Sequence, residues 1–166
     1  MILTTPHLRL EPFEDSHFEG LLALNSDPVV MRFFKALASE EDIRVWIQEV
    51  QARWVRLGYA WWSFIDRETE MLVGAGCIQN LEKDETKPLE VGWRLRPEHW
   101  GKGLATEAGR AMLGFAFDEL EAEEVFAVAN PDNVASLRVM ERLGMRPLGL
   151  QPFYGSMVAT YVKARH

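Results

Sequence analysis

A strand, a glycine turn and a helix follow one another in the stretch LEVGWRLRPEHWGKGLATEA, and this order constrains the fold more than any other feature. Residues 89–95 have the alternation of a buried strand, with Val91, Trp93 and Leu95 on one face. Pro97 cannot donate to a sheet ladder, so the strand is expected to end just before it. The stretch therefore predicts a sheet strand that leads directly into a helix.

The turn holds two glycines, Gly101 and Gly103, on either side of Lys102, and helical spacing resumes at Leu104. A glycine turn at this place directs free backbone N–H groups to the positive end of a helix. Such an arrangement binds anions, and a diphosphate is the expected ligand. The spacing is neither that of a P-loop nor that of a dinucleotide-binding turn, because Thr106 stands where G-x-G-x-x-G needs its third glycine.

The composition narrows the class of protein. The chain has 166 residues, of which 48% are hydrophobic, so we expect one globular domain that spans residues 1–166. A formal net charge of -7 without a Lys/Arg cluster argues against a nucleic-acid partner and mildly favours a cationic substrate. The lone Cys77 and four scattered histidines predict neither a disulfide nor a metal site. No leader and no membrane-length apolar run is recognised, so we expect a cytoplasmic protein without a membrane partner.

Hydrophobic periodicity predicts alternating strands and helices along the chain. We expect strands at residues 3–13, 61–65, 71–81, 89–95, 124–129, 148–153 and 157–162, and helices at residues 17–24, 39–57, 105–120 and 135–143. Cys77 lies inside one of these strands and is interpreted as a small core residue rather than a catalytic thiol.

Several segments resemble the GNAT acyltransferase superfamily. Residues 100–105, Trp-Gly-Lys-Gly-Leu-Ala, are similar to its diphosphate loop [QR]-x-x-G-x-[GA], with Trp100 in place of Gln or Arg. That Trp within RPEHWGKGLATEA, and the opening TTPHLRLEPFEDSHFEGLLALNSDPVVMRFF, resemble the RimJ/RimL-type branch. NPDNVASLRVMERLGM resembles the second landmark, N-x-x-S/A followed by a helix and a Gly-aromatic pair, with Met145 at the aromatic position. The likeness thus extends over nearly the whole chain.

The resemblance implies the α/β (α+β) GNAT fold, a mixed, mostly antiparallel sheet of about seven strands flanked by about four helices. In this fold two central parallel strands splay apart, which leaves unpaired backbone groups on the strand ending at Leu95. Unpaired buried amides favour a ligand that supplies partners, as the pantetheine of acetyl-CoA does, and one such N–H would polarise the thioester carbonyl. The cofactor-binding residues expected on this basis are Trp93, Leu95, Trp100, Gly101, Lys102, Gly103, Leu104, Ala105, Thr106, Asn133 and Ser136.

Direct acetyl transfer needs a neutral amine, which for an alkylamine of pKa about 10.4 costs roughly 4–5 kcal/mol at pH 7. Glu90 is the expected general base, because it is the acid on the strand beside the splay. A solvated or salt-bridged strand carboxylate explains Glu90 equally well. Glu98 and Glu107 are weaker choices, and favourable interaction with the helix dipole is enough to explain Glu107.

The departing CoA thiolate is helped by a proton donor. Many GNAT enzymes use a Tyr seven residues after the landmark Asn, but counting from Asn133 reaches Met140, which cannot donate. The resemblance to RimL implies Ser136 instead, although this Ser also suits a helix N-cap. Tyr154 is an alternative donor from the last hairpin. Asn133 is expected to hydrogen-bond pantetheine or an ordered water, or else to form an Asx turn.

The sequence therefore predicts an N-acetyltransferase that moves an acetyl group from acetyl-CoA directly to a primary amine. The amine belongs either to a protein N-terminus or to a small molecule, and the enzyme is a monomer or a homodimer. The alternative is a noncatalytic acyl-CoA-binding module, which Met140 keeps open. By the same resemblance residues 29–34 border the acceptor pocket, although core packing explains Met31, Phe33 and Phe34 as well.

Overall fold

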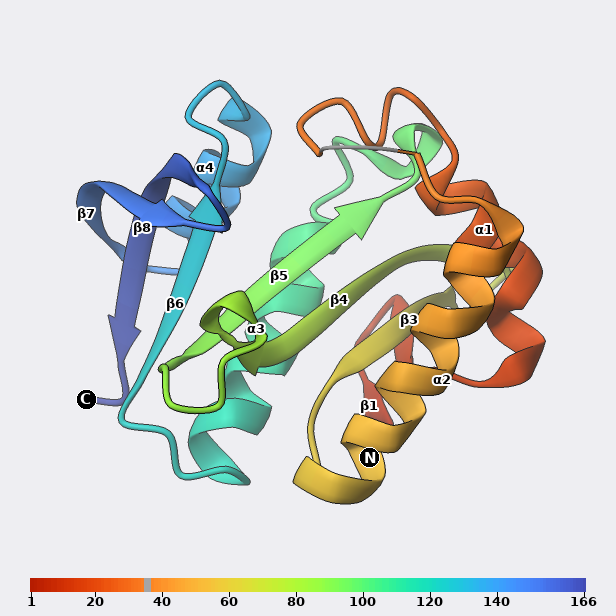
Figure 1. Ribbon diagram of the computed structural model, residues 1–166, viewed down its shortest axis with the longest axis horizontal. Helices are drawn as coiled ribbons and strands as arrows, with labels where there is room; N and C mark the ends of the chain where they lie inside the picture. The colour runs from red at the N-terminus through yellow and green to blue at the C-terminus, as the bar shows by residue number, and fades with distance from the viewer. Residues whose placement is uncertain (35–36) are drawn as a thin grey trace.

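The computed structural model describes residues 1–34 and 37–166, and within them eight strands form one sheet (Figure 1). The strand order is β1-β2-β3-β4-β5-β6-β8-β7. The strands are β1 (Leu3–Thr4), β2 (Leu8–Pro12), β3 (Trp61–Asp66), β4 (Leu72–Asn80), β5 (Leu89–Leu95), β6 (Glu124–Ala129), β7 (Arg146–Phe153) and β8 (Ser156–Ala164). All neighbours pair antiparallel except β5 and β6, which run parallel, so the predicted mixed sheet is confirmed.

Four α-helices of the described chain cover the two faces of this sheet (Figure 1). They are α1 (Phe18–Asn25), α2 (Glu40–Leu57), α3 (Leu104–Asp118) and α4 (Val134–Arg142), and short 3-10 turns lie at η1 (Asp15–His17), η2 (Leu81–Lys83) and η3 (Pro97–His99). Helices α1 and α2 pack on one face, and α3 and α4 pack on the other. None of these helices is long and apolar enough to cross a membrane.

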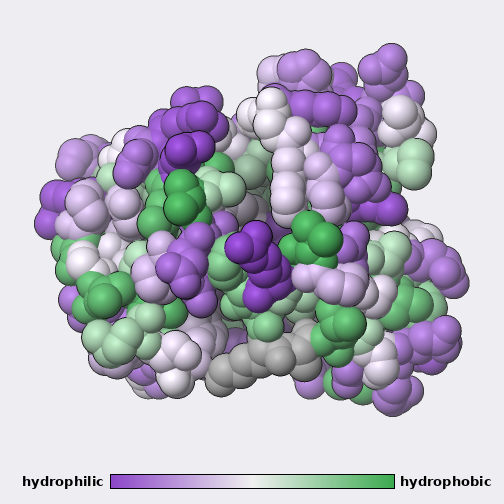
Figure 2. Space-filling model, turned by 90° about the horizontal axis from the view of Figure 1, so that it is seen from above, coloured by the Kyte–Doolittle hydropathy of each residue, from purple (hydrophilic) through white to green (hydrophobic). Residues whose placement is uncertain are grey.

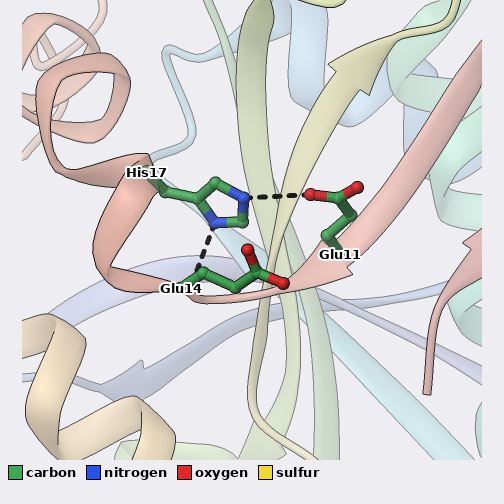
Figure 3. Close-up of side chains that lie close together, drawn as sticks. All are labelled: Glu11, Glu14 and His17. Atoms are coloured by element: carbon green, nitrogen blue, oxygen red, sulfur yellow. Dashed lines mark hydrogen bonds and ion pairs between the residues drawn. The ribbon is translucent and has the colours of Figure 1, made fainter.

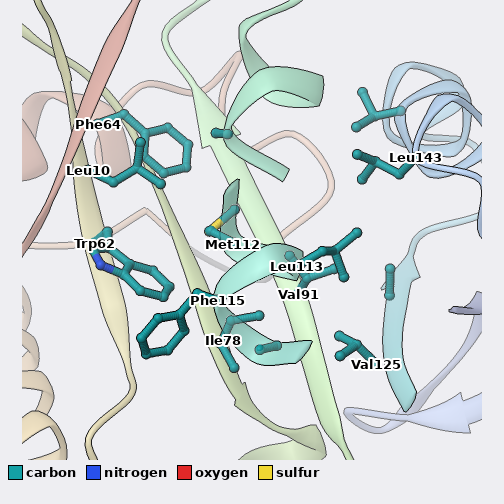
Figure 4. Packing of buried hydrophobic residues seen from close by; sticks show 14 of the residues in the cluster. Leu10, Trp62, Phe64, Ile78, Val91, Met112, Leu113, Phe115, Val125 and Leu143 are labelled. Atoms are coloured by element: carbon teal, nitrogen blue, oxygen red, sulfur yellow. The ribbon is translucent and has the colours of Figure 1, made fainter. Parts of the chain in front are cut away.

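Each face of the sheet has its own hydrophobic core because side chains alternate along the strands. On the α3 side, Met112 and Phe115 pack against Trp62 and Phe64 of β3 (Figure 4). On the other side, α1 and α2 pack against Trp61 and its neighbours. The two cores hold the sheet rigidly between the helices, which fixes the direction of every side chain on its central strands.

Several boundaries differ by a few residues from the sequence-based expectation, β7 and β8 among them, and two of the differences have a clear local cause. The first strand is split into β1 and β2, because the chain turns around Pro6, where the Thr5 N–H donates to the Leu8 carbonyl at 2.9 Å and the Leu8 N–H donates to the Thr5 hydroxyl at 3.0 Å. Helix α4 begins at Val134, because the Asn133 side chain accepts the backbone N–H of Ser136 at 3.3 Å. Asn133 is therefore the N-cap, and the interpretation of Ser136 as the cap is wrong.

The central parallel pair splays as predicted. Strands β5 and β6 are in register only at Leu89 with Val125 and at Glu90 with Phe126. Beyond this point β5 continues against β4 alone, as far as Leu95, and β6 continues against β8 alone. Figure 1 shows the two strands moving apart toward their carboxyl ends. Backbone groups on the facing edges of both strands are thus left without a strand partner.

Candidate functional site

A cavity of about 1000 Å³ opens where β5 and β6 diverge. Seen from above, the surface is hollowed between the two halves of the sheet, with polar and apolar side chains around it (Figure 2). Its lining includes residues 90–94 of β5, residues 128–130 after the splay of β6, the start of α4 and the β7–β8 turn. Met31, Phe33 and Phe34 line it as well, so the segment before α2 does border this space.

Glu90 lies in the lining of this cavity and is only 7% exposed. The Tyr154 hydroxyl donates to its Oε2 at 2.6 Å, and the Gln79 amide donates to its Oε1 at 3.5 Å. Burial raises the pKa of Glu90 to about 7, although both hydrogen bonds act to lower it. A solvated or ion-paired carboxylate does not fit this environment. A carboxylate that titrates near neutral pH is instead suited to accept and release a proton.

Gln79 fixes the orientation of this group. Its Oε1 accepts the indole N–H of Trp61 at 3.2 Å and Nη1 of Arg53 at 3.3 Å, so its amide nitrogen points to Glu90 and to the Tyr154 hydroxyl. Gln79 was not identified from the sequence. A polar residue that ends the buried run of β4 is the signal that could have found it.

Tyr154 occupies the tight turn between β7 and β8. Its φ of 55° is in the left-handed region, and its N–H donates to Glu82 at 3.0 Å. Burial and the neighbouring Glu90 raise the pKa of its hydroxyl, so the hydroxyl keeps its proton. The structure therefore places Tyr154 as a donor to Glu90, rather than as a free donor beside a leaving group.

Helix α4 brings Asn133, Ser136 and Met140 to the same cavity. The Asn133 oxygen is engaged in the cap, and the Ser136 hydroxyl is not needed for it. Met140 is fully buried in the core on the α3 side and offers no proton. Of the groups expected to assist a leaving thiolate, Ser136 is thus the one that faces the cavity from this helix.

The glycine turn before α3 lies beyond the end of β5. Trp100 occupies the position usual for Gln or Arg, and its indole N–H donates to the Leu95 carbonyl at 2.9 Å, which ties the turn to the strand. Gly101 and Gly103 have φ of 75° and 76°, and an added Cβ at either position would meet nothing within 4 Å. Lys102 between them is exposed. The space beside both glycines is therefore open, which lets a diphosphate approach the backbone of the turn closely.

The first turn of α3 adds free N–H donors next to this glycine turn. Gly103 is the N-cap and has no side chain to satisfy the free N–H groups of Leu104 to Thr106. Leu104 is buried in the core, so only its backbone is available, while Ala105 is partly exposed. The Thr106 hydroxyl is buried and has no partner among the described residues. Unused donors at a helix N-terminus fit an anionic ligand.

The weaker acidic candidates have structural partners. Glu107 accepts from the Thr5 hydroxyl at 2.5 Å and from the backbone and ring nitrogens of His7 at 2.9 and 2.8 Å. It therefore fastens the N-terminal hairpin to α3. Glu98 pairs with Arg96 at 3.1 Å on the surface.

Within the described chain, one group of side chains is spaced like metal ligands, namely Glu11, Glu14 and His17 (Figure 3). His17 Nδ1 accepts the Glu14 backbone N–H at 3.0 Å and lies 2.8 Å from the Ser63 hydroxyl. This leaves Nε2 as the donor to Glu11 at 3.0 Å. Both ring nitrogens are already in use, so the cluster is explained as packing at the start of α1.

Comparison with known proteins places these features in a family. The model of the acetyltransferase (GNAT) domain matches residues 7–146. The Bacillus subtilis protein YkkB is 32% identical over 144 residues, which cover 86% of this chain and 84% of YkkB. A GNAT-family acetyltransferase from Bacillus anthracis superposes with a TM-score of 0.83 at 26% identity, over 99% of both chains. RimL, a ribosomal L7/L12 alpha-N-protein acetyltransferase in complex with coenzyme A, shares the fold with a TM-score of 0.83 at 18% identity, over 99% of this chain and 98% of RimL.

Proposed function

This chain belongs to the GNAT acetyltransferase family and uses acetyl-CoA as its cosubstrate, and we propose that it acetylates a primary amine directly, with Glu90 as the general base. The observation that carries the proposal is the buried Glu90 carboxylate, which lies at the point where β5 and β6 separate and has a pKa of about 7. A base at this point lies beside the unpaired strand edges that suit pantetheine. The single cysteine is free and buried, which agrees with a cytoplasmic setting.

Acetyl-CoA would be held by two parts of the chain. The turn at residues 100–103 and the first N–H groups of α3 would take the diphosphate, and the unused Thr106 hydroxyl adds a donor. The free edge of β5, from Val91 to Leu95, would pair with the pantetheine amides as a strand does. Trp93 and Asn133 line the cavity beside that edge.

The protein groups then divide the proton transfers. Glu90 takes one proton from the incoming ammonium, directly or through a water, and later releases it to solvent. The neutral amine attacks the thioester carbonyl, whose developing negative charge is stabilised by a free N–H of β5. After the attack the nitrogen carries two protons; as the C–S bond breaks, one of them passes to the thiolate through the Ser136 hydroxyl and the other stays as the N–H of the product amide. Tyr154 and Gln79 keep the Glu90 carboxylate in place throughout.

The proposal is tested by release of free CoA thiol from acetyl-CoA with a panel of primary amines and N-terminal peptides. We expect thiol release that depends on the amine and matches the amount of acetylated amine found by mass spectrometry. Glu98→Gln serves as a matched control for Glu90→Gln, because it removes an exposed acid that pairs with Arg96. Tight CoA binding without amine-dependent release across the panel would instead support a noncatalytic acyl-CoA-binding module.

A further inference from the structure

The same cavity holds a cation that the mechanism above does not use. Arg94 lies on the same face of β5 as Glu90 and Gly92, because successive side chains of a strand point to opposite faces. All three residues line the cavity. Its guanidinium lies among three aromatic rings, with Cζ 4.3 Å from the centroid of Phe34, 5.3 Å from that of Trp61 and 5.8 Å from that of Trp46. These rings remove water from around the charge but cannot neutralise it.

Arg94 uses only part of its N–H donors within the described chain. Nη1 donates to the side-chain oxygen of Asn25 and lies 3.7 Å from the sulfur of Met31. Asn25 is held in this orientation, because its amide nitrogen donates to the Leu21 carbonyl at 2.7 Å. Among the described residues, Nε and Nη2 have no such partner and no carboxylate forms an ion pair with Arg94. Lys35 and Ala36, which lie outside the described residues, carry no carboxylate either.

Arg94 remains a cation at neutral pH, because burial lowers its pKa only to about 10. A desolvated cation without an anionic partner is costly, and its natural complement is an anion that brings hydrogen-bond acceptors. The two unused nitrogens, Nε and Nη2, form one edge of the planar guanidinium. That edge matches the two oxygens of a carboxylate in a bidentate pair, which a lysine cannot form.

The four acids of the cavity lining, Asp42, Glu49, Glu82 and Glu90, do not fill this role, because none of them forms an ion pair or a hydrogen bond with Arg94 among the described residues. Asp42 accepts the Ser39 backbone N–H at 2.9 Å as part of the cap of α2. Glu82 is bonded to Lys87 and to the backbone of Tyr154, and Glu90 is bonded to Tyr154. The anion that complements Arg94 is therefore expected to come from a ligand.

We propose that Arg94 binds a carboxylate of the acceptor, so that the substrate of this enzyme is an amine that also carries a carboxylate. The inference rests on the proposed function, because it gives the two ends of the acceptor separate partners: Glu90 for the amine and Arg94 for the carboxylate. Four residues of strand separate the Cα atoms of these two residues by about 13 Å. Gly92 between them carries no side chain, which leaves room for the acceptor to lie along β5.

The carboxylate has two chemical sources, a free amino acid or an acidic residue near a peptide N-terminus. The test therefore uses two substrate series. One is a set of ω-amino acids of increasing chain length, each with its matched carboxamide, and the other is a set of N-terminal peptides with Asp or Glu, each matched to Asn or Gln. We expect the wild type to prefer the acid over its amide by about 10–100-fold in kcat/KM in at least one series.

Arg94→Gln is expected to abolish this preference, chiefly through KM, and Arg94→Lys is expected to keep only part of it. Arg94→Met removes the desolvated cation and is the second variant if Arg94→Gln fails to fold. Arg44→Gln is the matched control, because Arg44 stacks on Phe18 at 4.7 Å outside the cavity lining. It should leave the preference unchanged.

Two results would overturn the proposal: a preference for acids that survives in the folded Arg94 variants, or equal use of acids and amides by the wild type in both series. In either case, measurable acetylation of the carboxamides leaves the proposed N-acetyltransferase function intact. No turnover of any amine would instead count against that function. A binding readout supports the distinction, since at least one acid of the two series should raise the Tm of the CoA-bound wild type and not that of the CoA-bound Arg94→Gln variant, and no shift with any acid would count against the proposal.

Discussion

At the scale of single residues, the burial that suits Glu90 for proton transfer also costs folding stability. Its pKa is raised from 4.5 to about 7 by burial, so between these values the folded chain binds more protons than the unfolded chain. The contribution of Glu90 to folding is therefore fully favourable below the unfolded pKa and is lost as the pH rises through about 7. Once it is ionised, the buried Glu90 carboxylate therefore lowers the free energy of unfolding.

Glu90→Gln is accordingly predicted to stabilise the protein at pH 8, by about 3 kcal/mol at about 1.4 kcal/mol per pKa unit. The gain should nearly vanish at pH 4.5, where the wild-type carboxyl is neutral when folded. Urea unfolding at both pH values measures the difference. Equal stabilities of wild type and Glu90→Gln at pH 8 would contradict the raised pKa, whereas Glu98→Gln should show no such pH dependence.

Substitutions at Ser136 and at Asn133 test proton donation and helix capping separately. Because Asn133 is the cap of α4, Ser136→Ala should leave the free energy of unfolding nearly unchanged while it lowers kcat. Asn133→Ala should cost about 0.5–2 kcal/mol of stability, as the loss of a cap does. Melting temperature and turnover, measured on the same variants, test both statements. A Ser136→Ala enzyme with wild-type kcat would exclude Ser136 as the donor.

At the scale of elements, the sequence was most informative where the signal is local. Periodicity located the strands and helices, and the glycine turn predicted the N-terminal end of α3. Pro6 and the cap at Asn133 shifted boundaries by local hydrogen bonds that a pattern of apolar residues does not contain. The register of strands that are far apart in sequence was beyond such patterns.

The site residues show the same limit of sequence patterns, which do not specify contacts between distant parts of the chain. Glu90, Ser136 and Tyr154 were selected one at a time, from a strand, a motif and a hairpin. The bond from Tyr154 to Glu90 joins residues 64 positions apart and depends on how β8 pairs with β6 on one side and with β7 on the other. Arg94 and Gln79 were missed because their importance follows from which groups surround them, and only the assembled sheet specifies that.

The glycine turn before α3 gives the prediction for an element. Gly103→Glu should abolish the thermal shift caused by CoA, because it puts a negative side chain where the diphosphate is expected. Gly58→Glu is the matched control, because Gly58 also has a positive φ, 80°, and open space around its added Cβ, and it ends α2. Normal CoA binding by Gly103→Glu would mean that the diphosphate lies elsewhere.

At the scale of the whole molecule, the single sheet consists of two halves that are joined by the short β5–β6 pairing. Only two residue pairs connect β5 to β6, so the β6-β8-β7 half is otherwise held by the packing of α3 and α4 and by the hydrogen bonds of Tyr154 to Glu82 and Glu90. A ligand that pairs with both free strand edges would lengthen this pairing. Cofactor binding is therefore expected to stabilise the molecule as a unit.

CoA at a hundredfold excess over its Kd should raise the free energy of unfolding by about 2.7 kcal/mol. Amide exchange should slow on both sides of the splay, in residues 91–95 and 127–129, since both edges gain partners. Differential scanning fluorimetry and hydrogen exchange measure the two effects. An unchanged Tm at saturating CoA, or protection confined to one half of the sheet, would contradict this arrangement.

The proposed mechanism depends most directly on Glu90 as the base, and the pH dependence of kcat/KM for an accepted amine tests this role. For the wild type, log kcat/KM should rise with pH and bend near pH 7, where Glu90 becomes ionised. Glu90→Gln should lower kcat by about 10²–10⁴-fold and remove the bend, while CoA affinity stays the same. A Glu90→Gln enzyme that keeps both its turnover and the bend near pH 7 would contradict the account.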